Sequence, residues 1–427
     1  MSQTSIKRPL QLCLLALVSY GLFYGMSVFL ARVLDVDGFG EFNVAVATVI
    51  LLASLTSLGL EKYAVRSLSA YYEQRNWRHA RGFTIFSRNM ILLATVVVAV
   101  TFVAVSLVWA SISEREVSGP NLLAVSILPV VVLALLLVEF VTANGAVVRA
   151  TVVYRLLLPA SAFAFSGAVW LWSGGLSPFQ AVACYCASWI VALIALFGLV
   201  RRTFPAEVWK AEESRTPGVW VQQAIAFLIH SVMMTQFASL GIVVLELVDD
   251  TETSVALYSA AMQSGGFVVL LATATNRFYG PIASVMIERH DYREMRKTIR
   301  ERHSWIIPTT LVYLLAIIIF GKKILGLYGA DFTAAYPALC MIAAGASVSV
   351  WFAMAPNYLK FIGRGNLVLG VTAAAGVLNV LLLLLWARRY GATGAGAAYA
   401  ISLASMAIVF LVLGLRSIGK REALSRD

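Results

Sequence analysis

The sequence predicts an all-α integral membrane protein of about twelve transmembrane helices. Of its 427 residues, 60% are hydrophobic and only 13% are charged, whereas a soluble domain has roughly 25% charged residues. The mean hydropathy is +0.82. Apolar runs repeatedly reach the roughly 20 residues that a helix needs to cross the hydrocarbon core. A surface so poor in charge is stable only against lipid.

The apolar runs place six spans in each half of the chain. The first begins soon after Lys7 and Arg8 and is too long for a signal peptide, whose apolar region has roughly 7 to 15 residues. We therefore expect an uncleaved first helix. The predicted spans are residues 10–34, 42–60, 86–111, 121–141, 153–172 and 178–200, then 219–245, 254–275, 304–320, 334–355, 366–386 and 395–415.

The distribution of basic residues predicts the orientation. With both termini in the cytoplasm, the cytoplasmic segments hold 27 of the 33 Lys and Arg residues and the outer loops hold 5. This asymmetry follows the positive-inside rule and indicates a multi-pass protein of the bacterial inner (cytoplasmic) membrane. The net charge of +11 therefore reflects topology and the lipid bilayer as partner, and it does not indicate nucleic acid.

Loop lengths exclude several function classes. No predicted outer loop exceeds about fifteen residues, which leaves no room for an extracytoplasmic catalytic domain. The sequence has no G-x-x-x-x-G-K-[ST] or G-x-G-x-x-G motif, so no nucleotide site is predicted. A membrane-embedded transferase or polymerase would need paired acids or clustered histidines. The four histidines are scattered, and we expect no enzyme, cofactor or metal site.

The second half reads as a shifted copy of the first. This predicts two six-helix lobes, residues 1–210 and 211–427, in the same orientation, as in transporters that rock one lobe against the other. Residues 42–45 correspond to 258–261, residues 62–64 to 277–279, and residues 175–178 to 391–394, with offsets of 216, 215 and 216.

Four segments carry a family resemblance: ARVLDVDGFGEF at 31–42, SLGLEKYAVR at 57–66, LYSAA at 257–261 and ILGLYGADF at 324–332. Together they resemble the Wzx-type lipid-linked oligosaccharide (O-antigen and polysaccharide) flippases of the multidrug/oligosaccharidyl-lipid/polysaccharide (MOP) superfamily. The resemblance implies a V-shaped, MATE-like fold with a cationic central cavity. It also implies transport of undecaprenyl-diphosphate-linked sugars from the cytoplasmic to the outer leaflet, with other membrane enzymes of polysaccharide assembly as candidate partners.

The alternative is a MATE-like exporter of drugs or metabolites. Its cargo is usually cationic and would require acidic groups in the cavity. Glu139 is the single acid that the predicted spans place inside a helix, against Arg32 and an inner set of arginines. This balance favours an anionic cargo. Coupling to Na⁺ or H⁺ is left open by the sequence.

Charges near the membrane are the main candidates for a substrate site, because burying one in lipid costs about 2.5 to 3.5 kcal/mol. Arg32, near the outer end of the first span, suits a diphosphate or snorkels to the interface beside Asp35. A set at cytoplasmic helix ends either recruits the anionic head or anchors the topology. This set comprises Arg66, Arg88, Arg149, Arg155 and Arg277.

Polar residues within the spans complete the candidates. Glu139 is expected to pair with an arginine of a neighbouring helix, in preference to carrying a proton. His230, Gln236 and Gln263 lie near the middle of predicted spans seven and eight. They either form interhelical hydrogen bonds or, since the repeat relates these spans to the first two, contact the substrate.

Overall fold

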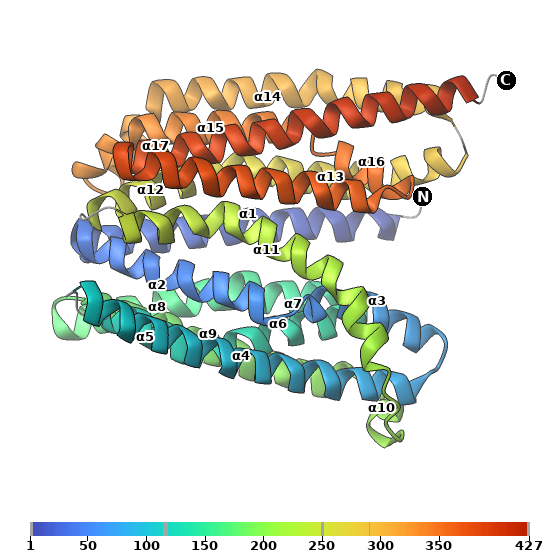
Figure 1. The fold of residues 1–427 in the computed structure, drawn as a ribbon, viewed down its shortest axis with the longest axis horizontal. Helices are drawn as coiled ribbons and strands as arrows, with labels where there is room; N and C mark the ends of the chain where they lie inside the picture. Colours follow the sequence, from blue (N-terminus) through green and yellow to red (C-terminus); the bar gives the residue numbers. More distant parts are fainter. Residues whose placement is uncertain (1–2, 114–117, 249–251, 290, 425–427) are drawn as a thin grey trace. The chain divides into compact units, whose positions relative to one another are not determined.

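The computed structural model describes residues 3–113, 118–248, 252–289 and 291–424, and within them the regular structure is helical throughout. Ten helices are long and apolar enough to cross a membrane, and one bent pair adds an eleventh span. The last of the ten, within α17 (Gly365–Leu424), consists of two helices joined at Gly391, whose backbone is not helical. Each of the twelve predicted spans lies mostly on helical residues (Figure 1), and the spans at 42–60 and 334–355 each contain a turn.

The chain forms two compact units, and the first comprises residues 18–243. It contains most of α1 (Gln3–Val33) and nearly all of α11 (Pro217–Val248). Between them lie α2 (Asp35–Thr56), α3 (Leu60–Glu73), α4 (Trp77–Ser113), α5 (Gly119–Ser126), α6 (Leu128–Ala143), α7 (Val147–Val152), the π-helical turn η1 (Val153–Leu157), α8 (Leu158–Ser173), α9 (Pro178–Thr203) and α10 (Ala206–Lys210).

The second unit comprises residues 1–17 and 244–427. Helices α15 and α17 run side by side in it (Figure 1). They approach closely at Gly345, where an added Cβ would stand 2.4 Å from the Cα of Ala400. Its other elements are α12 (Glu252–Gly265), η2 (Gly266–Val268), α13 (Val269–Glu288), α14 (Tyr292–Gly326), η3 (Asp331–Ala335), α15 (Tyr336–Trp351) and α16 (Ala355–Phe361).

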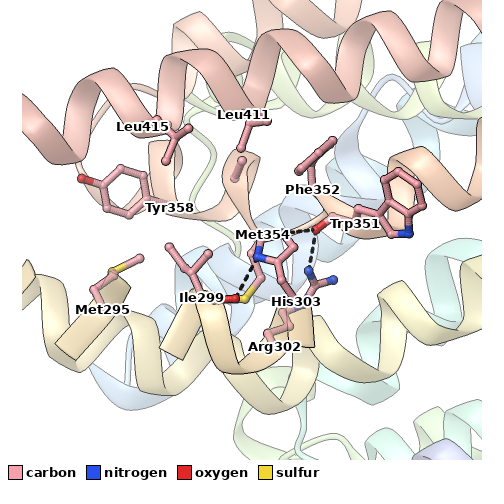
Figure 2. Close-up of a pocket in the computed structure, with 12 residues that line it drawn as sticks. Met295, Ile299, Arg302, His303, Trp351, Phe352, Met354, Tyr358, Leu411 and Leu415 are labelled. Atoms are coloured by element: carbon pink, nitrogen blue, oxygen red, sulfur yellow. Dashed lines mark hydrogen bonds between the residues drawn. The ribbon is translucent and has the colours of Figure 1, made fainter. Parts of the chain in front are cut away.

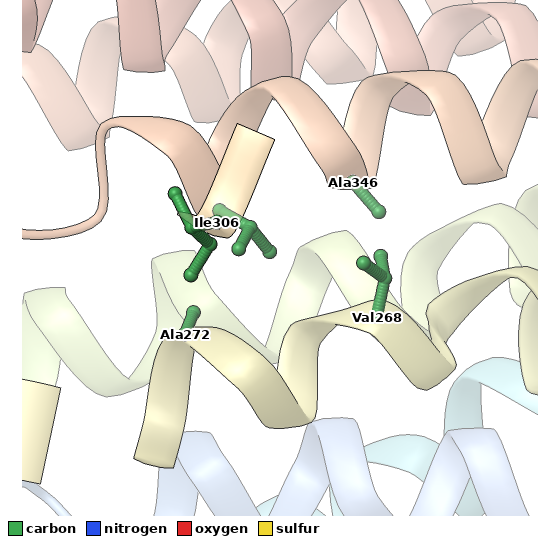
Figure 3. Packing of buried hydrophobic residues seen from close by; sticks show 5 residues of the cluster. Val268, Ala272, Ile306 and Ala346 are labelled. Carbon is green, nitrogen blue, oxygen red and sulfur yellow. The ribbon is translucent and has the colours of Figure 1, made fainter. Parts of the chain in front are cut away.

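A cluster of buried aliphatic side chains joins three helical segments of this unit. Val268 and Ala272 come from η2 and α13, Ile306 from α14, and Ala346 with Val350 from α15. Figure 3 shows four of them facing one another. In lipid the gain from such a cluster is close packing rather than removal from water, so these small and branched side chains fix how the three segments fit together.

Several helices extend beyond the predicted spans. Helix α2 begins at Asp35, so the predicted outer loop at residues 35–41 is in fact helical. The Asp35 carboxylate accepts a hydrogen bond from the Gly38 backbone N–H at 2.8 Å, and acids are favourable at a helix N-terminus. Helices α4 and α14 likewise start in segments that were predicted as cytoplasmic loops, because polar residues can continue a helix outside lipid.

The division into lobes at residues 210 and 211 stays a prediction. In the first unit, α11 packs on the turn between α2 and α3, where an added Cβ on Gly59 would stand 2.3 Å from the Ala224 carbonyl oxygen. The buried Trp220 side chain donates from Nε1 to the Tyr71 hydroxyl at 2.8 Å. Most of the seventh predicted span therefore belongs to the same compact unit as the first six.

Candidate functional site

The site begins at a break between α2 and α3. Leu58 and Gly59 both have a left-handed backbone, with φ of 51° and 70°. Such a φ is strained for leucine, whereas glycine adopts it freely. Gly59 is also needed for the close approach of α11 described above. The predicted span at 42–60 therefore ends earlier, at Thr56, and a new helix starts with Leu60 and Glu61.

Three charged side chains meet just after this break. Glu61 is 4% exposed, and its Oε2 has no hydrogen-bond partner among the described residues. Lys62 Nζ lies 3.8 Å from Glu61 Oε1 and 2.5 Å from Glu139 Oε1. Glu139 thus has the cationic partner that was predicted from a neighbouring helix, but the partner is a lysine and not an arginine. Two carboxyl groups therefore share one ammonium group.

The pKa values of the two α3 residues reflect this arrangement. Burial raises the pKa of Glu61, an effect that Lys62 opposes and Glu139 reinforces. Burial alone would lower the pKa of Lys62, but Glu61, Glu139 and Tyr154 outweigh it and raise this pKa above its ordinary value. Both shifts act in the same sense: they favour the charged form of Lys62 and the protonated form of Glu61.

An irregular helical turn places Tyr154 beside this cluster. Residues 153–157 form a π-helical turn. Pro159 follows and lacks the N–H that would bond to the carbonyl of residue 155, which accounts for the irregular turn. The Tyr154 ring packs 6.2 Å from that of Trp189. Because π-turns occur frequently at functional sites, this geometry supports a role for the charged cluster.

The predicted arginines are placed on different helices of the first unit. Arg32 lies in α1, Arg66 in α3, Arg88 in α4 and Arg149 in α7, and all four are exposed. Arg88 Nε donates to the Asn89 side chain at 3.1 Å. Exposure leaves these guanidinium groups accessible to a ligand or to lipid headgroups, so their role in binding stays a prediction.

The remaining candidates have more varied surroundings. Arg155 and His230 are half-buried, and Gln236 is buried. Gln263, in the second unit, accepts a long hydrogen bond of 3.4 Å from the Tyr328 hydroxyl, as expected for a contact within a helix bundle. Arg277 lies in α13, and its side chain falls outside the described residues.

Arg302 is a buried cation that the sequence did not single out. It is 1% exposed, and it donates to the backbone carbonyls of Trp351 at 2.6 Å and Val350 at 2.7 Å. His303 Nε2 lies 3.0 Å from the same Trp351 oxygen (Figure 2). Arg302 comes at the end of a basic run from 293 to 302, so the positive-inside pattern already accounted for it and no local signal set it apart.

A cavity of about 50 Å³ lies beside Arg302 and His303. Its walls are almost entirely apolar and include Met295, Ile299 and Leu415 (Figure 2). An apolar cavity of this size does not suit a charged head group. We therefore place no substrate there.

Comparison with known protein families shows to which family this chain belongs. The model of a family described as "Polysaccharide biosynthesis protein" matches residues 7–287. The chain belongs to this polysaccharide biosynthesis family. Its described helices include ten that are long and apolar enough to cross a membrane, and its fold is that of solved MOP superfamily transporters. No curated protein is similar enough to count as a match.

Solved structures show the same fold at low sequence identity. An inward-facing multidrug resistance MATE family transporter has a TM-score of 0.72 and 16% identity, with 95% of each chain covered. The lipid II flippase MurJ, in an inward closed conformation, gives 0.69 and 12%, covering 95% of this chain and 87% of that one. A MOP superfamily transporter from Pyrococcus furiosus, described by the reverse polarity of its binding pocket, gives 0.66 and 14%, covering 97% and 94%.

Proposed function

We propose that this family member flips an undecaprenyl-diphosphate-linked oligosaccharide from the cytoplasmic to the outer leaflet of the bacterial inner membrane. Both termini lie in the cytoplasm, and two six-helix lobes alternate access to a site that contains the predicted arginines. The cargo has an apolar tail that stays in lipid and a charged head that must be shielded. Arginine suits that head, because its planar guanidinium matches phosphate oxygens.

The charge arrangement in the first unit supports an anionic cargo. The two acids beside the α2–α3 break are little accessible to a cargo, since Glu61 is buried and Glu139 is paired with Lys62. Arg32, Arg66 and Arg149 are exposed. An exporter of cationic drugs would need the opposite arrangement. The membrane potential also favours this direction, since each charge moved through 100 mV is worth about 2.3 kcal/mol.

The experiment is complementation of a bacterial strain that lacks its own oligosaccharide flippase. The parent chain, Arg32→Ala and Arg32→Lys are compared with the control Arg300→Ala, an exposed arginine of α14. We expect the parent and the control to restore surface glycan, while Arg32→Ala accumulates lipid-linked precursor at normal protein level. Arg32→Lys should fall between them.

The alternative function has its own readout in the same strains. If the parent restores no glycan in several glycan backgrounds but lowers the accumulation of a cationic dye, the exporter hypothesis replaces the flippase. If Arg32→Ala restores glycan as well as the parent does, Arg32 has no role in binding the head group.

A further inference from the structure

The segment that connects α9 to α11, residues 204–216, is bound to the first unit along most of its length. Its sequence is polar after Lys210 and is followed by Pro217-Gly218, a composition typical of a loose linker. The Arg81 guanidinium nonetheless donates from Nη1 to the carbonyl of Trp209 at 2.8 Å and to that of Ala211 at 2.6 Å. One side chain of α4 thus holds both sides of the turn after α10.

Two backbone contacts extend this attachment towards α11. The Ser214 N–H donates to the Arg78 carbonyl at 3.1 Å. One turn later, an added Cβ on Gly82 would stand 1.9 Å from the Ser214 carbonyl oxygen. Gly82 lies in helical backbone, so its role is to admit the connecting segment and not to supply an unusual backbone conformation. Any side chain at this position must displace the segment.

Apolar contacts fix both ends of the connecting segment. Phe204 is buried, with its ring 5.8 Å from that of Phe140, and Val208 is 1% exposed. At the other end Trp220 is fully buried, with its ring 5.4 Å from that of Phe83. The segment is therefore packed, as well as hydrogen-bonded, against α4 and α6.

We propose that the connecting segment stays docked on α4 throughout transport and that Arg81 and Gly82 are positioning residues for α11. The chain passes from the second unit to the first inside α1, after Leu17, and back to the second inside α11, after Val243. In this proposal the connecting segment, held by backbone and side-chain contacts, moves as part of the first unit. This inference rests on the proposed alternating access, but docking itself is measured without cargo.

The first test measures docking by thiol reactivity. Ser214→Cys is introduced into a chain whose four native cysteines are replaced by alanine, and labelling by a membrane-impermeant maleimide is followed in inside-out vesicles. Arg81→Ala should raise the labelling rate of Ser214→Cys roughly tenfold or more, as expected for losing two charge-assisted hydrogen bonds. Gly82→Ala should do the same. The matched control is Gly218→Ala, where an added Cβ meets nothing within 4 Å. Equal labelling in all variants would show that these residues do not hold the segment.

The second test asks whether the segment must open during transport. Arg78→Cys and Ser214→Cys are joined by a short bifunctional thiol reagent, because the backbones of these residues are hydrogen-bonded to each other. We expect the cross-linked chain to restore glycan as well as the unlinked double variant does. Loss of glycan on cross-linking, with cargo transport intact before it, would overturn the proposal. If the unlinked parent moves no lipid-linked cargo, the proposed function fails while the labelling result still decides docking.

Discussion

The two units contain a similar broken helix that is stabilised in different ways. In the first unit, α6 ends at Ala143 and α7 starts at Val147; in the second, α15 ends at Trp351 and α16 starts at Ala355. Helices α6 and α15 each have 16 residues. At the first break the free carbonyl groups of the helix end accept hydrogen bonds from residues of the break itself. At the second break they also accept hydrogen bonds from a side chain of another helix.

Local hydrogen bonds account for the first break. Gly145 has φ of +77°, and the Ala146 N–H donates back to the Val141 carbonyl at 3.2 Å, a pattern typical of a glycine-terminated helix. The Asn144 side chain caps the Phe140 carbonyl at 2.9 Å. In the second break, residues 352–354 include no glycine. The Val350 carbonyl accepts a long backbone hydrogen bond from Ala353 at 3.4 Å, and Arg302 donates to the carbonyls of both Val350 and Trp351. The comparison shows that a helix end in this fold can be satisfied locally or at long range.

The largest effect is expected from Arg302→Ala. It leaves the buried carbonyls of Val350 and Trp351 without their charged donor, and we expect a loss of stability of about 3 to 5 kcal/mol. Melting in detergent measures it. Arg300→Ala, on the exposed side of the same helix, should change stability by less than about 0.5 kcal/mol. Similar melting of the two variants would show that the second break does not depend on Arg302.

A smaller effect is expected at the charged cluster near the first break. Since the pKa of Glu61 is raised in the folded state, folding favours its protonated form. That contribution is present below the pKa of the unfolded chain and is lost as pH rises through the folded-state value. Glu61→Gln should therefore stabilise the protein at pH 8, on the order of 2 kcal/mol, and should have little effect at acidic pH. A difference that grows as pH falls would contradict the assignment.

Gly145→Ala tests whether the break after α6 depends on the left-handed backbone of its glycine. A left-handed backbone costs an alanine about 1 kcal/mol relative to glycine, and an added Cβ at Gly145 meets nothing within 4 Å. The loss should therefore be purely conformational. Gly167→Ala, also without neighbours but inside helix α8, is the control and should be neutral or slightly stabilising. Equal melting temperatures for Gly145→Ala and the control would show that the left-handed backbone at Gly145 carries no cost for alanine.

The smallest effect is expected for Asn144→Ala. It removes one side-chain hydrogen bond to a helix-end carbonyl, a change of about 0.5 to 1 kcal/mol. Melting beside Asn366→Ala, an exposed asparagine of α17, isolates the cap. If Asn144→Ala destabilises as much as Arg302→Ala does, the two breaks are not stabilised differently.

The sequence by itself predicted the membrane class and the order of the apolar helices along the chain. Apolar runs of sufficient length indicate lipid contact regardless of what packs against them, which is why the helical fold could be predicted. The family resemblance was confirmed by the family model that matches residues 7–287. Gly145 and Pro159 are also visible locally, because glycine and proline act on their own backbone.

Only the tertiary structure decided which charges are buried and what they contact. Arg302 belongs to a basic run, and the residue that it contacts at the end of α15, Trp351, lies 49 residues further along the chain. Lys62 and Glu139 are 77 residues apart, and Gly82 is needed only because residues 204–216 lie against it. These features depend on which helices pack together. No local pattern encodes them, because the energy of a buried charge is set by partners distant in the chain.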